Sequence, residues 1–66
     1  MNIKHAYDQH RLALGELIRE KRASKGLSIS QMANMFGITN LEYMKWEGGD
    51  SVLKPKIIAM LSDILD

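Results

Sequence analysis

The sequence predicts an all-α domain, and three observations support this prediction. Apolar residues recur every three or four positions along most of the chain, which is the period of a helix. Two segments open with Ser or Thr followed three residues later by Gln or Glu, which is a helix-start signal. No segment offers a strand of useful length. We therefore expect one compact domain over residues 1–66, a bundle of four or five helices.

The first helix is best defined from Asp8 to Lys25. Its inner face is formed by Leu14, Leu17, Ile18 and Arg22. Gly26 is expected to end it in a left-handed conformation. The apolar stripe continues upstream through Ile3, Tyr7 and His10. Residues 1–13 are therefore either the start of this helix, beginning near Asn2, or a frayed N-terminal extension.

The second and third helices lie in residues 28–47 and are separated by a short turn. Ser28 with Gln31 and Thr39 with Glu42 form the two capping boxes. Gly37 suits the left-handed turn after the second helix, and the pair at 48–49 ends the third. The expected inward-facing residues are Met32, Ala33, Phe36, Ile38, Tyr43 and Trp46.

The last helix begins at Pro55, a residue that suits the first helical position. Its apolar residues are Ile57, Ile58, Leu61, Ile64 and Leu65. This stripe is wide for one contact. We expect one edge to face the core and the other to face a second subunit.

Composition narrows the classes of function. The chain has 66 residues, no cysteine and a net charge of +1, and its pI is about 8.1. No apolar run approaches the ~20 residues that a membrane span needs, so we expect a soluble, cytoplasmic protein. His5 and His10 lack the i,i+4 spacing of a helical metal pair, and no serine has a nearby base. We expect no metal, no cofactor and no catalytic residues.

Residues 14–65 resemble the lambda-repressor and Cro-like helix-turn-helix family of prokaryotic and phage regulators. The matching elements are the run from Leu14 to Arg22, Lys25-Gly26-Leu27-Ser28, Met32-Ala33, Phe36-Gly37-Ile38-Thr39, Tyr43, Trp46-Glu47-x-Gly49 and Pro55. The resemblance implies a bundle that docks on double-stranded DNA, usually as a homodimer, with the helix at 40–47 in the major groove. Repression by occluding a promoter is the common consequence in this family.

The resemblance also implies the roles of individual residues. Base-edge contacts fall on Asn40, Leu41, Met44 and Lys45. Phosphate contacts fall near Ser28, Ile29, Asn40, Lys54 and Lys56. An internal ion pair joins Arg22 to Glu47, and we prefer this role for Arg22 over a phosphate contact. The family commonly has Gln where Ile29 stands and polar residues where Leu41 and Met44 stand.

Several of these residues have an alternative interpretation. Leu41 and Met44 either touch thymine methyl groups, mark a protein-binding surface, or belong to the core. Asn40 either pairs with adenine or completes the helix cap. The lysines at 45, 54 and 56 either contact DNA or are solvated surface residues.

Two hypotheses of function follow. The first is a sequence-specific DNA-binding regulator of transcription that acts as a homodimer. The second is a protein-interaction module, such as an antirepressor or adaptor, that uses the apolar surface of the same scaffold. The near-neutral charge, Ile29, Leu41 and Met44 favour the second.

Overall fold

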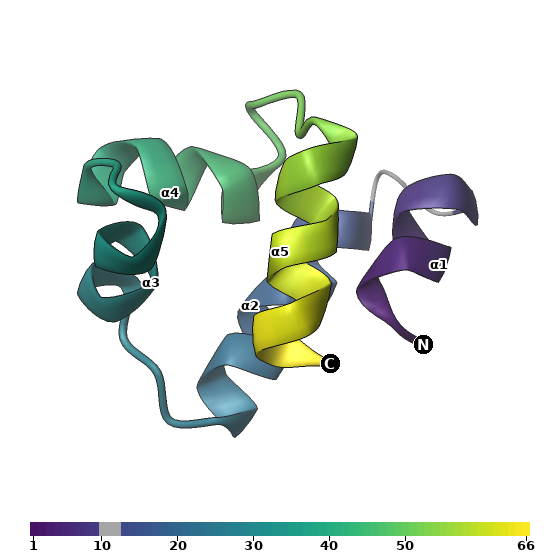
Figure 1. The fold of residues 1–66 in the computed structure, drawn as a ribbon, viewed down its shortest axis with the longest axis horizontal. Helices are drawn as coiled ribbons and strands as arrows, with labels where there is room; N and C mark the ends of the chain where they lie inside the picture. The colour runs from purple at the N-terminus through teal and green to yellow at the C-terminus, as the bar shows by residue number, and fades with distance from the viewer. Residues whose placement is uncertain (10–12) are drawn as a thin grey trace.

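The computed structural model describes residues 1–9 and 13–66, which fold into five helices and no strand. The helices are α1 (Ile3–Gln9), α2 (Leu14–Ser24), α3 (Ile29–Phe36), α4 (Asn40–Gly48) and α5 (Pro55–Leu65). In Figure 1, α3 and α4 lie at one end of the long axis and α1 lies at the other, with α2 and α5 between them. The predicted all-α fold is confirmed.

The core is a single apolar cluster to which all five helices contribute. Its members are Ile3, Ala6, Leu14, Ile18, Met32, Ala33, Tyr43, Leu53, Ile58, Leu61 and Leu65. The partly buried apolar residues packed against it include Leu17, Phe36, Ile38 and Trp46. The inner faces expected from the helical period are therefore those that are buried.

Glycines end three of the helical segments in the way the sequence indicates. Gly26, Gly37 and Gly49 have φ angles of 71°, 65° and 78°. In this left-handed region a side chain is unfavourable, so glycine is the natural residue. Pro55 occupies the first position of α5, as expected.

The expectation of one first helix from Asp8 to Lys25 is wrong, because two separate helices occupy this region. Asp8 lies in α1, and α2 begins only at Leu14. Instead α1 folds back on α2 and α5, where Ile3 and Ala6 become buried. His10, part of the predicted stripe, lies outside the described residues.

Both edges of the wide apolar stripe of the last helix are at least partly covered within the chain. Ile58, Leu61 and Leu65 are buried, while Ile57 and Ile64 are partly buried against the same core. The reason is that α5 packs against both α1 and α2. The small core is thus completed by α1 within one chain.

The end of α5 is tied back to α1 and α2 by one carboxylate. Oδ2 of Asp66 accepts hydrogen bonds from the Ile3 amide (2.9 Å) and the Ser62 hydroxyl (2.7 Å), and Oδ1 lies 3.1 Å from Lys21 Nζ. Burial alone would raise the pKa of Asp66. These hydrogen bonds and the Lys21 charge outweigh burial, so its pKa is below the ordinary value.

None of the described helices is long and apolar enough to cross a membrane.

Candidate nucleic-acid interface

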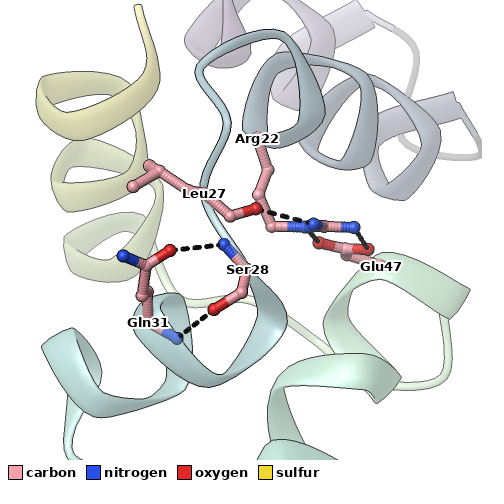
Figure 2. Close-up of polar contacts among 5 residues, drawn as sticks. All are labelled: Arg22, Leu27, Ser28, Gln31 and Glu47. Carbon is pink, nitrogen blue, oxygen red and sulfur yellow. Dashed lines mark hydrogen bonds and ion pairs between the residues drawn. The ribbon is translucent and has the colours of Figure 1, made fainter.

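Helices α3 and α4 form a helix-turn-helix whose two starts are fixed by reciprocal side-chain caps. Ser28 Oγ accepts from the Gln31 amide at 3.0 Å, and Gln31 Oε1 accepts from the Ser28 amide at 2.7 Å (Figure 2). Thr39 and Glu42 repeat this arrangement at the start of α4, at 3.1 and 3.2 Å. Both predicted capping boxes are therefore present. They define where each helix begins and hold the connecting turn to residues 37–39.

The inner face of α4 is fixed by aromatic packing. Tyr43 is completely buried, and its ring lies 5.7 Å from that of Trp46. Trp46 in turn meets Phe36 of α3 edge to face, with ring centroids 5.1 Å apart. Such contacts are more directional than aliphatic packing. They join α3 and α4 into one unit and determine which side of α4 faces outward.

The four residues expected to contact bases all lie on the exposed side of α4. Asn40 and Lys45 are exposed, Leu41 is 63% exposed and Met44 is 50% exposed. Leu41 and Met44 are consequently not core residues, and that interpretation is excluded. Among the described helices α4 packs against α2 and α3, while α1 lies at the far end of the molecule (Figure 1). Residues 1–9 therefore leave this surface open.

Helix α4 is anchored to α2 by the expected ion pair between Arg22 and Glu47. Arg22 Nε lies 2.6 Å from Glu47 Oε2, and Nη2 lies 3.3 Å from Oε1. Figure 2 shows the guanidinium and carboxylate facing each other, with Nη1 of Arg22 also donating to the Leu27 carbonyl oxygen at 2.9 Å. The side chains are only 15% and 7% exposed. The hydrogen bond to Glu47 raises the pKa of Arg22, and the charge on that carboxylate adds to the effect, so the guanidinium is always charged.

The Tyr43 hydroxyl is close enough to this ion pair to interact with both of its charged groups. It is buried and has no hydrogen-bond partner among the described residues, although it interacts electrostatically with both charged groups. Burial raises the pKa of Tyr43 well above its ordinary value, and Glu47 acts in the same direction. Tyr43 thus stays neutral at any physiological pH.

The residues expected near phosphates have different environments. The Ile29 side chain is partly buried against the core, so only its main-chain amide is suited to an anion. The Ser28 oxygen already accepts from Gln31, which leaves its hydroxyl proton to donate. Lys54 and Lys56 are exposed at the start of α5, where no side chain caps the helix. A helix N-terminus with two lysines attracts anions.

Asn40 does not complete the cap of α4, because Thr39 does so. Its Nδ2 instead donates to Ser30 Oγ at 2.9 Å, which ties the starts of α3 and α4 together. The amide oxygen of Asn40 and its second N–H are the groups that a base edge would need. Sequence reasoning missed Ser30, and the pattern of residues gives no signal for it, since the bond depends on how two helices meet.

No group of three or more His, Cys, Asp or Glu side chains is placed to hold a metal ion within residues 1–9 and 13–66. Comparison of the chain with family models, curated proteins and solved structures finds no match. The likeness to the lambda-repressor and Cro-like family therefore rests on the residues quoted above.

Proposed function

We propose that this protein binds double-stranded DNA sequence-specifically by placing the exposed face of α4 in the major groove. The observation that carries the proposal is the exposed row formed by Asn40, Leu41, Met44 and Lys45 on a helix whose opposite face is sealed by Tyr43. A major groove about 12 Å wide admits one helix. The tethered α3 then braces against the backbone, as in helix-turn-helix proteins generally.

The chemistry of the exposed row suits direct readout of bases. Lys45 donates to guanine O6 and N7, and Asn40 pairs with the N6 and N7 edge of adenine. Leu41 and Met44 offer apolar contact to thymine methyl groups. The row therefore favours a DNA site that offers a guanine to Lys45, an adenine to Asn40 and thymine methyl groups to Leu41 and Met44. In such a site A·T pairs face the start of α4.

Phosphate contacts are available at both ends of α4. Ser30 lies at its start, where it is hydrogen-bonded to Asn40, and Ser28 caps the start of the neighbouring α3. Lys54 and Lys56 follow the loop that leaves its end. If four phosphates are neutralised per complex, log K falls by roughly 3.6 per decade of salt. Two copies on a palindrome would occupy half-sites ~34 Å apart.

The test is selection of bound duplexes from a random pool, followed by affinity measurements on the selected sequence. Lys45→Ala is expected to weaken binding by about tenfold or more and to relax the preference at one base pair. Lys4→Ala is the matched control, because Lys4 is exposed on α1 at the other end of the molecule. Absence of any selected sequence at low salt would refute the proposal.

A second candidate function is a protein-interaction module, and one observation favours it. Three large apolar side chains of the helix-turn-helix are exposed: Met35 (47%), Leu41 (63%) and Met44 (50%). Methionine-containing apolar surfaces are common at protein interfaces. Leu41→Ser with Met44→Gln distinguishes the two functions. Weaker binding of the double variant to the selected duplex would support the first function, whereas a stable complex with a protein that the double variant abolishes would support the second.

A further inference from the structure

Gly15, in the first turn of α2, lies directly against the main chain of α4. A β-carbon built at this position would be 2.2 Å from the carbonyl oxygen of Glu47, 2.8 Å from its carbonyl carbon and 3.0 Å from the carbonyl oxygen of Trp46. Distances below 3.0 Å do not occur for real β-carbons, and the atoms here are backbone, so they cannot rotate away. Only glycine allows α2 and α4 to approach this closely.

Glycine is needed at position 15 because the main chain of α4 leaves no space there for a β-carbon. Gly26, Gly37 and Gly49 have positive φ angles, so conformation explains them. Gly15 is a helical residue in the first turn of α2 and has no positive φ angle, so its conformation does not require glycine. Gly48 is also helical, but a β-carbon there would meet only the flexible side chain of Asp50 at 3.5 Å. Gly15 and Gly48 are therefore a matched pair that differ in the space around them.

Helix α2 holds Glu47 at two points. Arg22 binds its carboxylate, and Gly15, about two helical turns earlier on the same face, contacts its carbonyl group. A single contact would leave α4 free to pivot. Two contacts along the axis of α2 fix both the separation of the helices and the direction in which α4 crosses.

We propose that Gly15 is a positioning residue for α4, setting how far the row from Asn40 to Lys45 projects from the protein. This inference rests on the proposed function, since projection matters only if α4 enters a groove. A methyl group at position 15 must push the end of α4 away from α2. Because the exposed row lies on the same rigid helix as Glu47, the displacement carries to it, and α3 follows through the Phe36–Trp46 contact. Base contacts are then lost although none of the contacting residues has changed.

The experiment compares three variants by two-dimensional NMR and by binding to the selected duplex. Gly15→Ala is expected to shift amide resonances across α4 and to reduce affinity by about tenfold or more, the worth of one base contact. Gly48→Ala is expected to bind as the parent protein does. Ile58→Ala truncates the core in α5 away from α4 and controls for weakened folding. All affinities are measured at a temperature at which each variant is fully folded.

Unchanged α4 resonances together with unchanged affinity in Gly15→Ala would overturn the inference. If that variant does not fold, the parent protein provides the test. Its crystal structure should then place the Gly15 main chain in van der Waals contact with the carbonyl oxygen of Glu47, and a separation wide enough for a β-carbon refutes the close approach. If the parent protein selects no duplex, the proposed function fails, while the resonance shifts of α4 still decide whether Gly15 positions the helix.

Discussion

Replacing Arg22 by methionine tests the anchor between α2 and α4. The change keeps the length and apolar stem of the side chain but removes three hydrogen bonds, two to Glu47 and one to the Leu27 carbonyl. The Glu47 carboxylate, only 7% exposed, is left without its counter-charge. Breaking a buried pair in this way typically costs about 3–5 kcal/mol. A domain of 66 residues has a total stability of roughly 3–10 kcal/mol, so the variant is expected to be close to unfolding.

The assay is equilibrium urea unfolding, with two further variants for comparison. Arg19→Met alters an exposed arginine of the same helix and is expected to change stability by less than about 0.5 kcal/mol. In Arg22→Met with Glu47→Leu, both charges are replaced by apolar groups, and most of the lost stability is expected to return. A loss below about 1 kcal/mol in Arg22→Met, similar to that of an exposed pair, would refute the inference that this partly buried ion pair stabilises the fold.

Three further predictions concern polar groups elsewhere. Tyr43→Phe removes a buried hydroxyl without a partner, so urea unfolding should show equal or higher stability, by up to about 1 kcal/mol; a loss above that would mean the hydroxyl is hydrogen-bonded. Asp66→Asn should speed amide exchange in α1. Because the pKa of Asp66 is lowered on folding, its stabilisation is complete above the unfolded pKa near 4 and is lost as pH falls through the folded value. The variant should therefore lose less stability on acidification than the parent, and parallel curves would contradict this. Ser30→Ala removes the hydrogen bond that orients the Asn40 side-chain amide. The variant should show a weaker preference for one base pair at the start of α4, with little loss of stability. An unchanged base preference would argue that Ser30 does not orient Asn40.

Local features of the sequence were sufficient to predict α3, α4 and α5. Capping boxes, a helical apolar period and glycines with positive φ act over three or four residues, so they are readable without knowledge of the fold. The same period predicted the buried face of α4, and hence that Lys45 points outward. The exposure of Leu41 and Met44 needed the structure, because their apolar character alone is equally compatible with a core.

Reasoning along the chain failed where helices meet. The division of α1 from α2 follows from the packing of α1 on α5, which an uninterrupted apolar stripe does not reveal. The same packing partly covers the second edge of the α5 stripe. Ser30 and Asp66 likewise acquire their roles from residues distant in the sequence or on another helix.

The sequence by itself determined an all-α chain, the limits of three helices and the inward side of α4, because each depends on interactions between near neighbours. Tertiary structure alone decided how α1 closes the core and how near α2 comes to α4. The close approach of α2 to α4 depends on the absence of a side chain at Gly15. The distance between two packed helices is set by the whole fold, so a pattern of neighbouring residues in the sequence does not predict it.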